Sequence, residues 1–435
     1  MNRIVSLLLL LCLASAVNSQ TIKKAQSYLD AKQLDKAKTE IDEYLVKNPN
    51  DAEGNYLKVK IYEGIVADPQ LAKTMQGDLR QQAFEAYKKV VADSTNVKAK
   101  MAIMRENYQP VFNLYSGYYE DAAKVFNDAA AAKSKEGFKD ALTLFEKANA
   151  IGQYIRENQW ASIGKVDTTL VLNLGKAALN AGDDALAEKY FRELADAKIK
   201  GTAGTVDEGF SVPYQWLTLY YKNKKDEPNM KKYGDLGISL FPKENYFNLV
   251  MMDYYREAKD MQGLFNIYDE LLKENPDSTN YHFNYANDIF GYLYNSDEGT
   301  VIKNKEVMLQ KLQAELDHSL RLNPNDVNNN WLYAQFYYNK GIETRDVADK
   351  IKSTKPEDVK RKADLTSQAR EYFNKSIPYA EKAITTLEAS QLKDDKSRFK
   401  SIANLMQNIY QSLQMKDKLK IYQDKYDNAD KTFIK

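Results

Sequence analysis

The same four-residue string follows helix-like segments at two distant places in the chain, and this repetition limits the fold more than any other feature. Asn-Pro-Asn-Asp occurs at Asn48–Asp51 and again at Asn323–Asp326, and the related Asn-Pro-Asp-Ser occurs at Asn275–Ser278. Proline cannot continue a helix, and the Asn, Asp or Ser after it can cap the next one. A repeated terminator predicts a repeated structural unit.

The length of this unit follows from similar residues that recur at a fixed interval. Leu217, Met251 and Tyr285 are 34 residues apart, and so are Pro242 and Pro276. Within a unit, spacings of 9, 4 and 8 residues also recur. Residues four apart share a helix face, and the longer gap leaves room for a tight turn between two antiparallel helices. Because one such hairpin cannot bury its apolar face alone, neighbouring hairpins must stack.

The best-formed unit contains Leu174, Gly175 and Ala178, followed by Ala187 and Phe191. On these residues and the 34-residue period, the chain resembles the tetratricopeptide repeat family of helix–turn–helix units. The resemblance implies an all-α superhelical solenoid of antiparallel helix pairs, with about nine repeats and several insertions. We expect the three small or apolar residues at 174–178 to meet Ala187 and Phe191 of the paired helix. The clean repeats lie near 21–51, 167–196, 211–243 and 245–277, and the degenerate or interrupted ones near 52–96, 97–150, 279–325, 327–390 and 399–428.

Three intervals within units are longer than nine residues. They are 62–83, 289–312 and 337–376, which span 21, 23 and 39 residues. Their added residues are polar and mostly compatible with helix, so we expect extended helices there rather than loops. By segment, we predict N-terminal repeats over 20–150, central repeats over 151–277, and C-terminal repeats with long-helix insertions over 278–435.

The first nineteen residues are not part of this pattern. Arg3 precedes the apolar run 4–13, which is too short to span a bilayer, and small residues follow it. These features predict a secretory signal peptide over 1–19. We expect cleavage before Gln20, with cleavage before Val17 as the alternative.

The leader also holds the chain's single cysteine, Cys12. A lipoprotein signal requires a small residue before the modified cysteine, and here that residue is Leu11. We therefore expect no lipid anchor at Cys12. The leader places the mature protein in the periplasm or otherwise outside the cytoplasm of a bacterium, without cysteine chemistry.

The charge of the chain indicates no polyanionic partner. The sequence has 62 basic and 61 acidic residues, and removal of the leader with Arg3 leaves 61 of each. A nucleic-acid-binding surface normally shows a marked basic excess, so no nucleic-acid partner is expected. The mature sequence also contains no apolar run long enough to predict a transmembrane span.

Motifs for catalysis are missing from the sequence. The two histidines, His282 and His318, lie outside any cluster with metal-ligand spacing, and no nucleophile or phosphate-loop motif is present. His282 lies beside the apolar stripe of its helix, which favours a packed or hydrogen-bonded imidazole. The sequence thus predicts no enzyme activity, no metal and no cofactor.

The first helices of four successive units carry a second stripe of residues, on the side away from the packing stripe. In the tetratricopeptide family such helices line a concave groove that holds partner peptides, and amides, aromatics and a few charges suit that use. The predicted groove residues are Gln215, Lys222, Asp253, Arg256, Asn287, Trp331, Gln335 and Tyr338, and the apolar members of the stripe are Leu219, Leu249, Phe283 and Phe290. Trp331 is the expected anchor, because large aromatic rings often dominate interfaces.

These observations predict a non-enzymatic scaffold of the bacterial cell envelope that binds a protein or peptide partner. Three alternatives remain open at this stage. One is a glycan- or nutrient-binding component of an outer-membrane uptake system, and another is an accessory to outer-membrane assembly or secretion. The third is an enzyme whose site lies in the insertions 291–311 and 341–372. Partner, oligomeric state and outer-membrane association are not encoded in the pattern.

Overall fold

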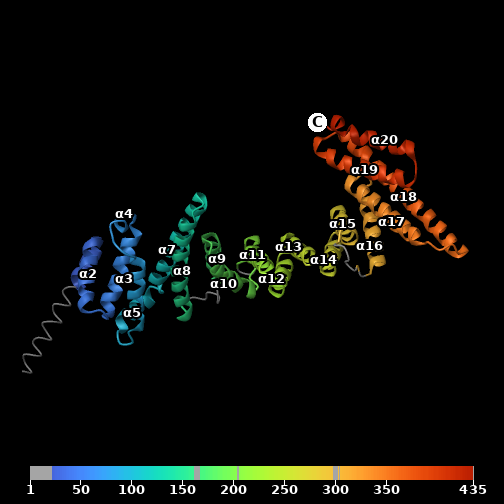
Figure 1. Ribbon diagram of the computed structural model, residues 1–435. Coiled ribbons are helices and arrows are strands. Elements are labelled where there is room, and N and C mark those ends of the chain that lie inside the picture. The colour runs from blue at the N-terminus through green and yellow to red at the C-terminus, as the bar shows by residue number, and fades with distance from the viewer. Residues whose placement is uncertain (1–21, 161–166, 203–204, 297–301, 303, 435) are drawn as a thin grey trace, which may run out of the picture. The chain divides into compact units, whose positions relative to one another are not determined.

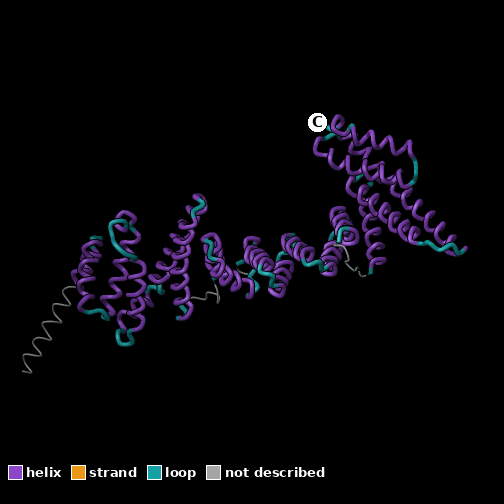
Figure 2. Tube along the Cα trace, in the orientation of Figure 1, coloured by secondary structure: helices purple, strands orange, loops and turns teal. Residues whose placement is uncertain are grey.

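A computed structural model describes residues 22–160, 167–202, 205–296, 302 and 304–434, and every regular element within them is helical (Figures 1 and 2). Successive helices pair as antiparallel hairpins, which confirms the predicted all-α array of helix pairs. The predicted leader, with Cys12, lies outside the described residues. Among those residues, no helix combines the length and hydrophobicity that crossing a bilayer requires.

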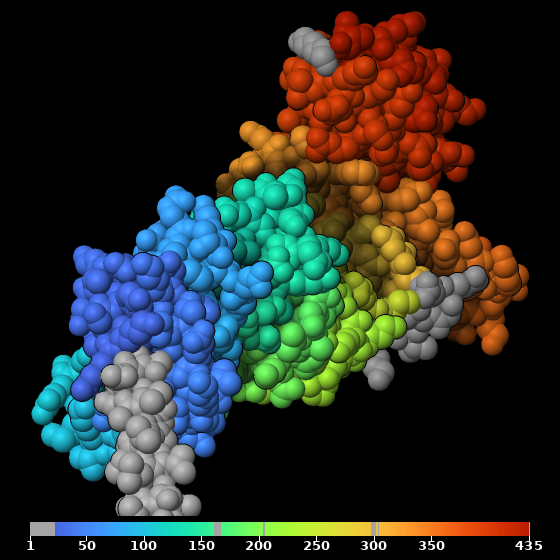
Figure 3. Space-filling view, turned by 90° about the vertical axis from the view of Figure 1, so that its left-hand side faces the viewer, coloured from blue at the N-terminus to red at the C-terminus, as the bar shows by residue number. Residues whose placement is uncertain are grey.

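The helices form two compact units, and the chain passes from the first to the second between Val250 and Met251. The first unit begins with a helix over 22–30. It continues with α2 (Leu34–Lys47), α3 (Ala52–Ala67), α4 (Pro69–Ala72), α5 (Leu79–Ala92), α6 (Val97–Arg105), α7 (Gln109–Ala132), α8 (Lys135–Glu157), α9 (Thr168–Ala181), α10 (Asp184–Asp196), η1 (Glu208–Ser211), α11 (Val212–Asn223) and α12 (Glu227–Leu240). In the space-filling view the blue residues of the first repeats form one closely packed body (Figure 3).

Helix α13 (Tyr246–Glu257) spans the division between the units. The second unit continues with α14 (Met261–Glu274), α15 (Thr279–Tyr294), α16 (Lys305–Leu322), α17 (Val327–Lys350), α18 (Pro356–Ser390), η2 (Lys393–Asp395), α19 (Lys396–Ser412), α20 (Lys416–Asp427) and α21 (Ala429–Thr432). The main contacts join α15 to α16, α17 to α18 and α19 to α20, as expected for hairpins. The predicted segment boundaries at 150 and 277 stay predictions.

The repeated terminator caps the helix that follows it and accepts a side-chain hydrogen bond from that helix. Asp51 accepts a hydrogen bond from the Gly54 amide at 2.7 Å and so caps α3. Four residues after this aspartate, Asn55 donates from Nδ2 to the carbonyl of Pro49 at 3.1 Å. The second copy of the string repeats both contacts, since Asp326 caps α17 and Asn330 donates to the Pro324 carbonyl at 3.1 Å. The asparagine six residues after the proline therefore links the next helix to the connection before it by a hydrogen bond.

Close helix packing at Gly175 agrees with the sequence prediction. A Cβ atom at this position in α9 would lie 2.3 Å from Cε1 of Phe191 in α10. Leu174, Ala178, Ala187 and Phe191 are all fully buried. Because a van der Waals contact between carbons needs about 3.5 Å, only a residue without a side chain fits against this ring.

Buried tyrosines with carboxylate partners connect neighbouring helices, which accounts for part of the high tyrosine count of 31. Each ring packs in the core, while its hydroxyl donates to an acid on an adjacent element. The pattern is formed by Tyr62 with Asp42, Tyr118 with Asp78, Tyr268 with Asp288 and Tyr333 with Asp317, at 2.5 to 2.7 Å. These pairs satisfy the phenol groups in the interior, as burial requires.

The interval 62–83 does not contain the extended helices that we predicted. Helix α3 ends at Ala67, short α4 follows, and α5 starts only at Leu79. The reason is Pro69, because the residue before a proline is pushed out of the helical region, and Asp68 has φ −102° and ψ 102°. In 337–376, by contrast, α17 and α18 are extended to 24 and 35 residues, as predicted. Part of 289–312 lies outside the described residues.

Candidate functional site

The first unit contains two of the predicted groove residues, both on α11. Gln215 and Lys222 are half-buried, and Gln215 donates from Nε2 to the Ser211 hydroxyl at 3.1 Å. Leu219, between them on the same face, is exposed. The predicted face therefore reaches the surface on α11, and the role of these residues in binding stays a prediction.

The predicted anchor on α17 also takes part in packing. Trp331, Gln335 and Tyr338 are half-buried, and the two aromatic rings lie against the hydrophobic core that α18 and α19 form. The Tyr338 ring centroid is 5.7 Å from that of Phe373 in α18. Phe290, the stripe residue on the preceding first helix α15, is buried and belongs to the core. The three stripe residues on α17 are only partly accessible, and their role in binding stays a prediction.

Arg256 and Asn287 come together in one open cleft of the second unit, which we call the Arg256 cleft. Its volume is about 300 Å³. Arg256 and Lys259 reach it from the end of α13, and Asn287 reaches it from α15. The full lining is Arg256, Lys259, Met261, Leu264, Asn287, Asp288, Gly291, Tyr292, Asn295 and Ser296. Consecutive first helices therefore supply its polar walls, and α14 supplies its apolar part.

The guanidinium of Arg256 is bound on several sides by protein groups. Its Nη1 donates to Asp253 at 2.8 Å, which joins two predicted residues in one ion pair. Its Nε and Nη2 donate to Asp288 at 3.1 and 2.9 Å, and Nη2 also donates to the Tyr268 hydroxyl at 3.2 Å. Tyr268 donates to Asp288 at 2.5 Å and closes the network. Because two carboxylates bind its guanidinium, this arginine is a fixed part of the cleft wall.

The ionisation of this network follows from its burial and its charges. Partial burial by itself lowers the pKa of the Arg256 guanidinium, but the hydrogen bonds and charge of Asp288 outweigh burial and raise that pKa above its ordinary value. Burial, followed by the charge of Asp288, raises the pKa of the Tyr268 phenol. The arginine is therefore charged and the phenol neutral throughout the physiological range.

The remaining lining offers both donors and acceptors to a ligand. Asn287 and Asn295 contribute amides, and Ser296 and Tyr292 contribute hydroxyls. Nothing lies within 4 Å of the place where a Cβ of Gly291 would be, so this part of α15 leaves open space. Of the charged lining residues, Arg256 and Lys259 are positive and Asp288 is negative, and Asp253 and Asp288 together compensate the charge of Arg256. Because the guanidinium is already paired, the amides and hydroxyls are the groups that would bind a ligand, and they suit a neutral polar one.

Sequence reasoning missed Asp288, Tyr292, Asn295 and Ser296 as parts of this site. One signal was present for Asp288, which lies 32 residues after Arg256, close to one repeat interval. A basic residue in one first helix and an acid about one repeat later can meet across adjacent hairpins. No comparable spacing marks Asn295 and Ser296, which lie at and beyond the end of α15.

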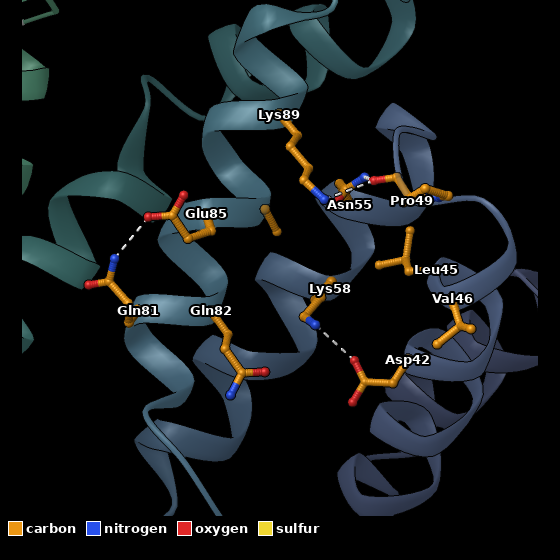
Figure 4. Close-up of a pocket in the computed structure, with 11 residues that line it drawn as sticks. Asp42, Leu45, Val46, Pro49, Asn55, Lys58, Gln81, Gln82, Glu85 and Lys89 are labelled. Atoms are coloured by element: carbon orange, nitrogen blue, oxygen red, sulfur yellow. Dashed lines mark hydrogen bonds and ion pairs between the residues drawn. The ribbon is translucent and has the colours of Figure 1, made fainter.

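A second cleft lies in the first unit, between α2, α3 and α5 (Figure 4). It has a volume of about 450 Å³ and includes Val46, which is 82% exposed. Lys58 pairs with Asp42 at 2.9 Å, and the Lys89 ammonium donates to the Pro49 carbonyl at 3.0 Å. Much of this cleft is formed by second helices, so it is separate from the predicted first-helix face. In the described part of the chain, no group of three or more His, Cys, Asp or Glu side chains is placed to hold a metal.

Comparisons with known proteins add little to this geometry. No family model matches the chain, and no curated protein matches it. The solved structures that match include PilW, a type IV pilus biogenesis factor, at 13% identity over 60% of this chain and 94% of that one, with a TM-score of 0.27. They also include the TPR domain of P58(IPK), at 11% identity over 83% and 99% with a TM-score of 0.22, and yeast Tom70, at 11% identity over 94% and 89% with a TM-score of 0.23. At such scores these likenesses carry no argument, and the assignment of tetratricopeptide-like helix pairs rests on the hairpins themselves.

Proposed function

We propose that this protein is a non-enzymatic interaction scaffold of the bacterial cell envelope, and that it binds a partner polypeptide along its first helices. The observation that carries the proposal is the Arg256 cleft, which α15 and the residues at its end line with amide and hydroxyl groups. An extended polypeptide presents backbone donors and acceptors at regular intervals. Amide side chains can match both kinds of group, which makes them suitable for sequence-tolerant peptide binding.

The lining favours a polypeptide over a glycan as the ligand. A glycan-binding pocket is expected to gather several aromatic rings, whereas Tyr292 is the one aromatic residue that lines the Arg256 cleft. Trp160, which could have served such a pocket in the first unit, is instead stacked on Tyr108 with 4.7 Å between ring centroids. Export to the envelope is supported by the leader pattern over 1–19 and is part of the proposal.

The proposal is tested with a library of uncharged random peptides displayed on phage and selected on the immobilised mature chain. The affinity of a selected peptide is then measured for the wild type and for Asn287→Ala. A loss of about tenfold is expected, since removal of one hydrogen-bonding partner costs about 1–1.5 kcal/mol.

The matched control is Asn266→Ala, which removes an exposed asparagine from α14, the second helix of the neighbouring hairpin. Its affinity for the selected peptide should equal that of the wild type. Equal affinity of all three proteins, or a library that yields no binder, would contradict the proposed use of this face.

A further inference from the structure

Both histidines of the chain lie together in the second unit, although 36 residues separate them in the sequence. His282 is on α15 and His318 is on α16. Their ring centroids are 4.0 Å apart, and the ring planes differ by 20°. The hydrogen bonds around each ring determine which nitrogen atoms carry protons.

His282 occupies a position that the repeats use for a hydrogen-bond donor. It follows Pro276 by six residues, as Asn55 follows Pro49 and Asn330 follows Pro324. Like those asparagines, it contacts the carbonyl of its proline, with 2.8 Å between Nε2 and the oxygen. A carbonyl only accepts hydrogen bonds, so Nε2 carries a hydrogen.

The other nitrogen of His282 faces a carboxylate. Its Nδ1 is 2.5 Å from Oε2 of Glu315, and both side chains are only 8% exposed. A lone pair so close to a carboxylate oxygen would be repelled, so a proton lies between the two atoms. The other oxygen of Glu315 is 3.0 Å from the Lys311 ammonium, which stabilises the negative charge. The contacts therefore describe an imidazolium–carboxylate pair in the interior.

His318 is in the opposite state. Its Nδ1 is 2.9 Å from Nη2 of Arg321, and a guanidinium only donates. Nδ1 must accept, so the ring is neutral and its hydrogen is on Nε2. Burial, followed by the charges of His282 and Arg321, lowers the pKa of His318.

We propose that these stacked rings are a proton-controlled latch, in which His282 is the charged ring, His318 is the neutral ring, and a second proton loosens the junction of α14, α15 and α16. A proton on His318 breaks the hydrogen bond from Arg321 and places two positive rings face to face. The other charged or titratable groups of the junction are Asp277 from the connection, which lies 4.0 Å from Nε2 of His318, and Lys311 from α16, which pairs with Glu315. Lys311 in turn contacts Asp269 from α14 and the ring of Tyr285 from α15.

The direction of the pH effect follows from the lowered pKa of His318. The unfolded chain takes up a proton there more readily than the folded chain does, so acid favours unfolding. The stability contributed by the neutral ring is complete above the ordinary histidine pKa of about 6.5 and is lost as the pH falls below it. Since α15 also carries Asn287 and Asp288, loosening would disturb one wall of the Arg256 cleft, but the latch does not depend on peptide binding.

The test uses the mature chain with ¹⁵N-labelled histidine, which gives signals from two rings only. Near neutral pH, one ring should show the doubly protonated pattern and the other the neutral pattern with hydrogen on Nε2. In His282→Asn, which restores the asparagine of the other two strings, the titration midpoint of His318 should move to higher pH. Two neutral rings in the wild type, or an unchanged midpoint in the variant, would overturn the latch.

A second measurement follows the helices themselves by hydrogen exchange, corrected for the intrinsic effect of pH on exchange. Protection of α15 and α16 in the wild type should fall between about pH 7 and pH 5, the range in which histidine titrates. In His318→Gln, whose amide oxygen can still accept from Arg321, this loss should be much smaller. An equal loss in both proteins would show that the second proton does not control the junction.

Discussion

Gly175→Ala adds a single methyl group at a close contact between the two helices of the α9–α10 hairpin. The new Cβ would lie 2.3 Å from Cε1 and 2.5 Å from Cδ1 of Phe191. Since carbon atoms need about 3.5 Å, the ring would have to retreat by roughly 1.2 Å. Phe191 is fully buried, and its ring meets Trp216 edge to face at 5.5 Å, so the displacement would pass on to α11.

Two opposing terms set the size of the effect. Overpacking of a core by one methyl group costs about 1–3 kcal/mol. The better helix propensity of alanine offsets up to about 1 kcal/mol of this cost. We therefore expect a net loss of about 1–2 kcal/mol in the free energy of unfolding. Gly175→Leu, which brings a larger side chain to the same place, should cost more.

The assay is urea unfolding followed by circular dichroism, with Gly291→Ala as the matched control. Gly291 is also inside a helix, but a Cβ there would meet nothing within 4 Å. The same substitution should therefore stabilise α15 by up to about 1 kcal/mol, because only the propensity term remains. Opposite signs for the two variants would separate packing from propensity.

The double variant Gly175→Ala/Phe191→Leu tests the same contact from the other side. A smaller, flexible side chain should relieve the clash, so the two substitutions together should cost less than the sum of their separate costs. The reasoning is refuted if Gly175→Ala stabilises the protein as Gly291→Ala does, or if the two substitutions add without coupling.

Four further results are expected. Tyr333→Phe removes a buried hydrogen bond to a carboxylate and should lower the free energy of unfolding by about 1–3 kcal/mol in urea titrations. Tyr87→Phe, whose hydroxyl has no hydrogen-bond partner among the described residues, should leave the free energy of unfolding nearly unchanged; equal effects would contradict the role given to the carboxylates. Trp331→Ala should weaken polypeptide capture by about 2 kcal/mol. It should also reduce the free energy of unfolding by about 1–3 kcal/mol, because the ring packs on the core of α18 and α19; a binding titration and a urea unfolding curve measure the two effects separately. Burial and a nearby carboxylate raise the pKa of Tyr410 to about 12, so the stability from its neutral phenol is complete below about pH 10 and lost above it. Absorbance at alkaline pH should show late phenol ionisation together with loss of helix, and ionisation of every tyrosine near the ordinary pKa would refute this. The intact mass of the exported protein should match a start at Gln20 without acyl chains, and a lipid-modified cysteine at its N-terminus would contradict the leader assignment.

Much of the fold could be derived from the sequence because its information is local. The spacing of Gly175 and Phe191 placed them on facing helices, since residues that share a hairpin must meet across its turn. The Asn-Pro-Asn-Asp strings predicted helix ends and starts, and Asp51 and Asp326 cap those starts. Pro69 also carried a local signal, and the prediction of extended helices over 62–83 was wrong because this proline ends the helix before it.

The site depended on tertiary structure to a much greater degree. Helical periodicity identifies the face on which a residue lies, but the next repeats decide what covers that face. Phe290 and Trp331 are on the predicted stripe, yet one is buried and the other packs on the core of α18 and α19. Arg256 and Asn287 line a common cleft only because α13, α14 and α15 pack together, which also brings Asp288 and Tyr268 beside Arg256.

The two histidines show the same limit more clearly. The sequence placed His282 beside a packing stripe, which predicted a packed or hydrogen-bonded imidazole, and it predicted nothing about the charge of either ring. Which nitrogen holds a proton depends on the acceptors and donors that two separate elements place around the rings, namely Pro276 from the connection before α15 and Glu315 and Arg321 from α16. Protonation is set by distances of a few ångströms between side chains, and those distances exist only after the hairpins have packed.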